Sequence, residues 1–269
     1  MLHSSPAGTY GGWLTEDGSI LDTEETAFLL KTLFEASETL VLRLSPFLIL
    51  EQKNDSGPFT NVSGAGISCI PDQTYILDTR IGLEALEKRW KKKLGRKLKK
   101  AETSGVCIHR TDQNTDIERF YTLYKSCIET WNPPPGHIYP PEFIATLLKD
   151  TGSADLWIAE YENKVIAGAI VARGINHWAY WLGATDRNYS HLRAANLLHT
   201  QIIITQCNEG VQWYDFNPSA GLKGVEQFKA SFGATKKAAP LFIKKRPFFH
   251  FLEKSSTLVK RFTSSILPT

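Results

Sequence analysis

The sequence contains no apolar run of the roughly 20 residues that a membrane-spanning helix needs. Its best candidate, Val165 to Ala172, is too short and contains a glycine. The basic start of a secretory signal peptide is also absent, because five acidic residues precede Lys31, the first positive charge after the amino terminus. We therefore expect a cytoplasmic protein without a transmembrane segment.

Cysteine is scarce, and several catalytic motifs are missing. The four cysteines match no short metal-binding spacing, so we expect reduced, buried thiols and no metal site; they are Cys69, Cys107, Cys127 and Cys207. No H-E-x-x-H or G-x-S-x-G pattern occurs, which leaves metalloprotease and serine-hydrolase chemistry without support. Gly64-Ala65-Gly66 lacks the third glycine and the following helix of a dinucleotide-binding fingerprint.

Positive charge is segregated along the chain. The 269 residues include 31 Lys and Arg and 28 Asp and Glu, a formal net charge of +3. Residues 88–100 hold nine basic residues and no acid, and residues 236–261 hold eight basic residues and one acid. The remaining residues carry a formal charge of −13. Such segregation is typical of contact with an anionic partner.

The first 81 residues show few regular elements. Apolar residues recur at helical spacing from 27 to 37, and strand-like stretches occur at 40–50, where Pro46 interrupts, and at 74–77. These elements are too few for a complete domain. From Gly82 to Glu102 apolar residues step by three or four positions, which predicts one helix with a single apolar stripe and otherwise basic faces.

From residue 105 onward the pattern is regular. Expected strands lie at 106–110, 156–161, 165–172, 178–183, 211–216 and 241–244, and expected helices at 116–131, 141–149, 192–208 and 225–232. The three closely spaced strands predict an antiparallel meander, and the long helices that return to strands predict parallel crossovers. The fold class is therefore α/β (α+β), with a mixed sheet flanked by helices.

This order of elements resembles the GNAT (Gcn5-related N-acetyltransferase) fold, and shorter stretches narrow the resemblance. They are Tyr180-Trp181-Leu182-Gly183-Ala184, Asn196-Leu197-Leu198, Tyr214-Asp215-Phe216 and Phe228-Lys229-Ala230-Ser231-Phe232-Gly233. They resemble the Fem family of peptidoglycan-bridge aminoacyltransferases and its bacterial relatives, the BioF2-like acyltransferases. The Phe-Lys-x-x-Phe-Gly element is the most specific of them.

The resemblance implies four segments. Residues 1–81 form a partial GNAT-like half, 82–104 a basic connecting helix, 105–246 the GNAT-like acyltransferase domain and 247–269 a basic, aromatic tail. Fem-like enzymes carry two acyltransferase-like halves, and the leading strands and helix of the first half are missing here. A second copy of this chain and a different chain are the two alternatives for completing that half.

The resemblance also implies site residues. The lysine of the Phe-Lys motif, Lys229, is expected near the reacting carbonyl, where its cation stabilises the developing negative charge. Asp215, at the end of an expected strand, is either a base for the attacking amine or a loop cap. Phe228, Tyr180 and Tyr10 are expected to contact substrate.

The loop before the long helix bears on the identity of the acyl donor. Coenzyme A-dependent members of the superfamily hold a pyrophosphate there on a glycine-rich loop, but residues 186–195 contain no glycine. Arg187 and Arg193 are the residues that can supply charge instead. We expect no permanently bound cofactor and an activated acyl donor as co-substrate. Acyl-coenzyme A is the less favoured donor, and aminoacyl-tRNA becomes relatively more favoured.

The basic helix and the basic tail are compatible with more than one binding partner. Lys92, Arg96 and their neighbours are expected to hold an anionic substrate, either a tRNA or a nucleotide-linked or lipid-linked precursor. A peripheral contact with the inner face of a membrane and a solvated basic face are the other two interpretations. The function expected is transfer of an acyl or aminoacyl group to an acceptor amine, with peptidoglycan precursor as the family's typical acceptor. Its rivals are a non-catalytic binding module and a coenzyme A-dependent acetyltransferase.

Overall fold

The computed structural model describes residues 2–3, 9–12, 22–48, 67–130, 138–149, 152–219 and 221–244. The chain divides into two compact units, one of residues 1–73 with 238–269 and one of residues 74–237, and each is described by itself. The expected tail at 247–269 and the proline-rich turn at 132–136 lie outside the described residues.

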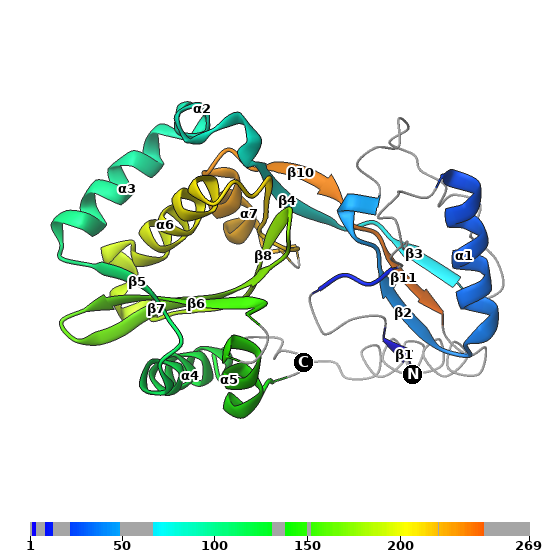
Figure 1. Cartoon of the computed structure of the whole chain (residues 1–269), viewed down its shortest axis with the longest axis horizontal. Helices are drawn as coiled ribbons and strands as arrows, with labels where there is room; N and C mark the ends of the chain where they lie inside the picture. The colour runs from blue at the N-terminus through cyan, green and yellow to red at the C-terminus, as the bar shows by residue number, and fades with distance from the viewer. Residues whose placement is uncertain are drawn as a thin grey trace, which may run out of the picture. The chain divides into compact units, whose positions relative to one another are not determined.

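The first unit contains a four-stranded sheet and a helix (Figure 1). The strands, in sheet order, are β1 (Leu2–His3), β2 (Leu40–Arg43), β11 (Leu241–Lys244) and β3 (Ile67–Ile70). The helix α1 (Thr23–Ala36) starts at a capping box made by Asp22 and Glu25. Leu30 and Phe34 of α1 are buried in one cluster with Leu42 and Phe242.

Two predictions for this unit can be compared with the structure. The strand-like stretch from 40 is interrupted at Pro46 as expected: β2 ends at Arg43, and Pro46 starts a short 3-10 helix, η1 (Pro46–Leu48). The strand predicted at 241–244 is confirmed, and it pairs antiparallel with both β2 and β3. The last described strand of the chain therefore lies in the same sheet as the first ones.

The second unit is built on a seven-stranded mixed sheet. Its strands, in sheet order, are β10 (Thr235–Ala238), β4 (Gln73–Asp78), β9 (Trp213–Asp215), β8 (His177–Thr185), β7 (Lys164–Arg173), β6 (Ala154–Tyr161) and β5 (Cys107–Thr111). β5 to β8 are antiparallel neighbours, as the meander predicts, whereas β8 and β9 are parallel. The predicted mixed sheet is confirmed, and β10 is a strand that the sequence pattern did not indicate.

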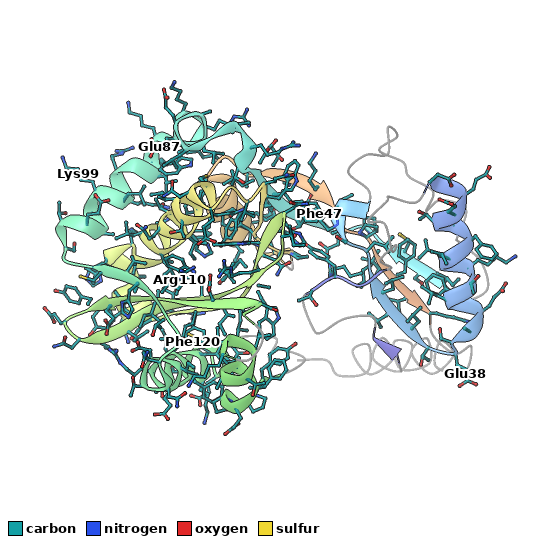
Figure 2. The ribbon with its side chains drawn as sticks, in the orientation of Figure 1. Glu38, Phe47, Glu87, Lys99, Arg110 and Phe120 are labelled. Atoms are coloured by element: carbon teal, nitrogen blue, oxygen red, sulfur yellow. The ribbon has the colours of Figure 1, made fainter. Side chains whose placement is uncertain are left out.

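Helices cover both faces of this sheet. α4 (Asn114–Ile128) and α5 (Pro141–Lys149) lie on one face, and α3 (Lys92–Thr103) and α6 (Ala194–Asn208) lie on the other (Figure 1). Each face has its own apolar cluster. Phe120 of α4, labelled in Figure 2, packs so closely on β7 that a Cβ at Gly168 would lie 2.4 Å from its ring. Only glycine fits at that position without displacing α4.

The basic segment is two helices rather than the single one predicted. α2 (Leu83–Arg89) ends at Trp90, whose backbone is extended, and α3 begins after Lys91. The Lys91 N–H donates to the Ser231 carbonyl at 3.0 Å instead of continuing the helix. Gly233 has φ +82°, and its missing side chain leaves room for Arg89. The Phe-Lys-x-x-Phe-Gly element therefore also anchors the break between α2 and α3.

Cysteine burial differs from the prediction. Cys127 is buried and Cys207 is half-buried, but Cys69 and Cys107 are exposed. All four are free thiols. The expectation of buried thiols was therefore wrong for two of the four. None of the helices in the described part of the chain is both long and apolar enough to cross a membrane.

Candidate functional site

The strands β8 and β9 separate after three paired positions. The parallel register joins His177 to Trp213 and ends with Ala179 beside Asp215. β9 stops there, whereas β8 continues to Thr185. Within the described residues, the second half of β8 therefore has one edge without a strand partner. Backbone N–H and C=O groups on such an edge are available to hydrogen-bond a bound molecule.

A β-bulge lies at the start of that open edge. Ile170 of β7 pairs with Leu182, but Val171 pairs with Tyr180, so Trp181 is an extra residue in β8. A bulge redirects the side chains on either side of it. The ring of Trp181 packs 4.7 Å from that of Tyr139, while the ring of Tyr180 lies 4.6 Å from His199 of α6. The two neighbouring side chains therefore enter different surroundings, as alternation along a strand predicts.

Lys229 is a buried lysine near the point of strand separation. It lies on α7 (Lys223–Ala230), and only 2% of its surface is exposed. Its ammonium donates to the carbonyl oxygens of Asn217, at 2.5 Å, and Pro218, at 3.1 Å. A buried ammonium needs such partners, because removing a charge from water without them is costly. The ammonium is thus held in place at a position almost fully shielded from solvent.

Asp215 is fully buried at the end of β9. One of its carboxylate oxygens accepts hydrogen bonds from the Thr74 hydroxyl, at 2.6 Å, and from the Asn217 N–H, at 2.8 Å. These contacts are those of a residue that caps the turn after β9. They also place a carboxylate two and three residues along the chain from the carbonyls that hold Lys229.

An aromatic cluster surrounds His199 between these groups. Its ring lies 5.3 Å from Phe228 and 4.6 Å from Tyr180, and its Nδ1 is 2.9 Å from the hydroxyl of Tyr214. Burial, reinforced by the Lys229 charge, lowers the pKa of His199 to about 3. The imidazole is therefore neutral at physiological pH. Burial also raises the pKa of Tyr180 to about 12, so its phenol stays protonated.

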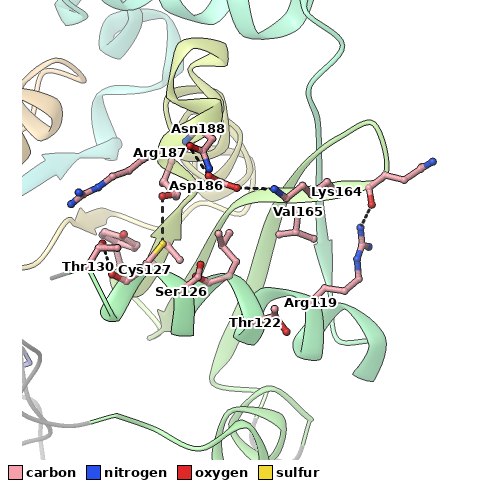
Figure 3. A pocket seen from close by; sticks show the side chains of 16 residues that line it. Arg119, Thr122, Ser126, Cys127, Thr130, Lys164, Val165, Asp186, Arg187 and Asn188 are labelled. Carbon is pink, nitrogen blue, oxygen red and sulfur yellow. Dashed lines mark hydrogen bonds and ion pairs between the residues drawn. The ribbon is translucent and has the colours of Figure 1, made fainter.

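A cavity of about 910 Å³ opens beside Tyr180 (Figure 3). Its walls come from α4, the starts of β7 and of the 3-10 helix η4 (Arg187–Leu192), and the end of β8. Cys127 of α4 lies in this wall, with its thiol 3.4 Å from the Thr185 carbonyl. Lys229 and Asp215 do not line the cavity. Tyr180 joins the two regions, because it lines the cavity and also contacts His199.

Of the three cations on the cavity wall, two are paired with acids. Arg119 bonds to Glu160 and Asp116, and Lys164 lies 2.9 Å from Asp186. Among the described residues no ion pair involves Arg187, which points away from Lys164 in Figure 3. Arg187 is therefore the cation of this cavity that a bound anion can engage.

The loop before α6 contains a carboxylate, that of Asp186. Asp186 accepts the Asn188 N–H at 3.0 Å at the beginning of η4, and it also pairs with Lys164. This carboxylate caps η4, whereas α6 begins after Arg193 and has no side-chain cap at its N-terminus. The predicted helix at 192–208 begins at Ala194, after η4 and a left-handed Arg193 with φ 62°.

Cations gather on α3 and at the start of α6. Burial, with Arg193 and Lys93 nearby, lowers the pKa of Lys97. Lys92 and Arg96 are exposed on α3, and Lys99 projects outward from it in Figure 2. In the described part of the chain, no ion pair involves any α3 cation. The apolar side of α3 is buried, and its exposed residues are cationic except for Gly95, Glu102 and Thr103.

The structure brings some predicted residues together and not others. Lys229, Asp215, Phe228 and Tyr180 lie around the end of the β8–β9 pairing; Arg187 lies on the cavity, and Arg193, Lys92 and Arg96 contribute to the basic surface. Tyr10 is half-buried in the first unit. Sequence reasoning missed Asn217, although an Asn-Pro pair directly after a strand is a turn signal. His199 lies in no metal-binding or triad pattern, so the sequence gives no signal for it either.

Gly183 is expected to be essential for the position of Tyr180. A Cβ built on Gly183 would lie 1.9 Å from the Tyr180 hydroxyl, so Gly183→Ala must push that phenol out of place. We expect the variant to fold and to change the ultraviolet difference spectrum of Tyr180 on ligand binding. The measurement compares Gly183→Ala with Gly95→Ala, because nothing lies within 4 Å of a Cβ at Gly95. A spectrum in Gly183→Ala that is as unchanged as the one expected for Gly95→Ala would contradict the role of Gly183 in positioning Tyr180.

Comparison with known proteins identifies the class. The chain matches the model of the acetyltransferase (GNAT) domain over residues 88–230 and belongs to that family. It is an acyltransferase by that membership. Among the described residues, no group of three or more His, Cys, Asp or Glu side chains is placed to hold a metal ion.

Solved structures share the fold over most of the chain. FemX is 12% identical and superposes with a TM-score of 0.63 over 86% of this chain and 80% of its own. L-PGS from Bacillus licheniformis is 8% identical, with a TM-score of 0.55 over 83% and 74%. The C-terminal domain (DUF2156) of a protein assigned as a lysylphosphatidylglycerol synthetase from Agrobacterium fabrum is 14% identical, with 0.57 over 82% and 74%. No curated protein matches the chain.

Proposed function

We propose that this acyltransferase moves an aminoacyl group from aminoacyl-tRNA to the amine of a cell-envelope precursor. The observation that carries the proposal is the end of the β8–β9 pairing, where an open strand edge, a buried cation and a buried carboxylate meet. Acyl transfer needs donors for a developing oxyanion and a group that handles a proton, and these residues are of those types.

Two features favour a tRNA donor over coenzyme A. The loop before α6, residues 186–193, contains no glycine and includes the carboxylate of Asp186, which disfavours a pyrophosphate there. The cations of α3 lie on one exposed helix, and nucleic-acid backbones bind to such arrays of charge. Because no apolar side chain accompanies them on that face, the surface fits a phosphodiester chain better than the interior of a bilayer.

The residues suggest a division of roles in the reaction. The acceptor amine attacks the ester carbonyl, the new C–N bond forms, and the C–O bond to the tRNA ribose breaks. Lys229 stabilises the negative charge that develops on the carbonyl oxygen. Asp215 receives the proton that the amine loses and then returns it to the leaving 3′-oxygen. Arg187 contacts a phosphate of one substrate at the cavity.

The proposal extends to the acceptor molecule and to the cellular location of the enzyme. FemX has the same fold, and a peptidoglycan precursor, linked to a nucleotide or a lipid, is the acceptor we infer. Such an acceptor places the enzyme in the cytoplasm at the inner face of the membrane. A second chain that adds to the first unit would extend its four-stranded sheet. The rival donor is acetyl-coenzyme A, which the family model itself favours.

One experiment separates these possibilities. The full-length chain is incubated with a tRNA pool charged with labelled amino acids and with nucleotide-linked muropeptide, and in parallel with labelled acetyl-coenzyme A. We expect label to move from tRNA to the muropeptide. Transfer from acetyl-coenzyme A alone would replace the tRNA donor. Absence of transfer, together with tRNA binding in a filter assay, would favour a binding module.

A further inference from the structure

Asn217 is the residue at which three parts of the site meet. Its carbonyl accepts from the Lys229 ammonium at 2.5 Å, and its N–H donates to Asp215 at 2.8 Å. Its side-chain amide donates to the Tyr180 carbonyl at 2.6 Å. Since Tyr180 is the first residue of β8 beyond the β8–β9 pairing, this amide bridges the two strands where they separate.

The backbone of Asn217 also has an unusual conformation. Its φ is 59°, in the left-handed region that side chains other than those of Asn, Asp and Gly rarely adopt. The residue is 7% exposed, and its Oδ1 is buried without a hydrogen-bond partner among the described residues. Strained backbone and an unsatisfied buried acceptor persist where the surroundings enforce them, which is common at functional sites.

These contacts combine into one role. The hydrogen bond from the Asn217 side-chain amide to the Tyr180 carbonyl holds residue 217 in the left-handed conformation. The backbone carbonyl of the same residue holds the Lys229 ammonium. Loss of the amide frees the turn that presents both carbonyl acceptors of Lys229, those of Asn217 and Pro218. The position of the ammonium therefore depends on a side chain that does not itself carry charge.

We propose that Asn217 is a positioning residue, which fixes the Lys229 ammonium beside the open end of the β8–β9 pair. The catalytic meaning of that position rests on the proposed function. The position itself does not, because it follows from hydrogen bonds within the chain. The two can therefore be tested by separate measurements.

The test uses two variants and a chemical probe of the lysine. Asn217→Gly keeps the left-handed backbone and removes the amide, whereas Asn217→Asp keeps the size and removes the donor to Tyr180. Acetic anhydride is added to the folded full-length chain, and mass spectrometry follows acetylation of Lys229 relative to Lys223, which is exposed on the same helix. We expect the Lys229 to Lys223 ratio to rise about fivefold in both variants, in proportion to one lost hydrogen bond.

A glycine control separates this role from a general effect of the substitution. Glu162 also has a positive φ, 49°, in the exposed turn between β6 and β7. Glu162→Gly is expected to leave the acetylation ratio unchanged. If both Asn217 variants keep the wild-type ratio, the positioning role is overturned, whatever their effect on thermal stability.

Turnover then links the position to catalysis. With charged tRNA and muropeptide, both Asn217 variants are expected to lower kcat about fivefold while KM for tRNA stays unchanged. A changed acetylation ratio in a chain whose wild type transfers nothing leaves the positioning role intact and refutes the proposed function. An unchanged ratio with active wild type refutes the positioning role alone.

Discussion

Replacing Lys229 with alanine is expected to lower the rate of aminoacyl transfer by about 10²- to 10³-fold, the loss typical when one preorganised stabiliser of an oxyanion is removed. The reason is the surroundings of the ammonium, which is 2% exposed and held by two carbonyl oxygens. A charge fixed in this way needs no reorganisation as the reaction proceeds. The measurement is single-turnover transfer from charged tRNA to muropeptide.

Two further variants distinguish charge from packing. Lys229→Met fills most of the same volume without a charge, and we expect it to lose as much activity as the alanine variant. Lys223→Ala removes an exposed lysine from the same helix and is expected to retain wild-type turnover. Both Lys229 variants leave buried carbonyls unpaired, at a cost of ~1–3 kcal/mol in the free energy of unfolding, so thermal melts must accompany the kinetics. Wild-type turnover in Lys229→Met would refute the role of the cation.

Removing charge from α3 is expected to weaken tRNA binding strongly. Lys92, Arg96 and Lys99 are all exposed and lie on one side of the helix, at spacings of four and three. Their joint replacement by glutamine should lower affinity about 10- to 100-fold and reduce the slope of log K against log salt by about 2, because three phosphate contacts and their released counterions are lost. Filter binding over a series of salt concentrations measures both quantities.

A control with the same change in charge shows whether the location matters. Lys31, Lys125 and Lys223 are exposed lysines outside α3, and their replacement by glutamine removes three charges as well. We expect it to change tRNA affinity by less than about threefold. Equal effects of the two triple variants would mean that net charge alone attracts tRNA. Loss of binding to anionic vesicles, with tRNA binding intact, would make α3 a membrane contact instead.

Much of the second unit could be predicted from local patterns. Helix α5 and strand β11 have the predicted bounds, and the meander of β6, β7 and β8 follows from short turns between strand-like runs. The Phe-Lys-x-x-Phe-Gly element drew attention to Lys229, which is buried in the structure. These successes rest on hydrophobic period and turn chemistry, which act between residues close in sequence.

Other features depended on contacts that no local pattern contains. The apolar stripe from Gly82 to Glu102 predicts one helix, yet the Ser231 carbonyl takes the Lys91 N–H and breaks it. The sequence places Asp215 near the end of an expected strand, but its hydrogen-bond partner Thr74 is 141 residues away along the chain. Asn217 carries no signal stronger than a turn, because its significance lies in what it joins.

The sequence by itself determined most of the order of elements, the mixed sheet and the separation of charge into two basic segments and an acidic remainder. Only the tertiary structure decided that β8 and β9 separate after Ala179, that β11 pairs with β2 and β3, and that one asparagine joins Tyr180, Asp215 and Lys229. The physical reason is that helical and strand periods are set by neighbours along the chain. The geometry of a buried polar site is set instead by hydrogen bonds between distant segments, each of which must be satisfied once water is excluded.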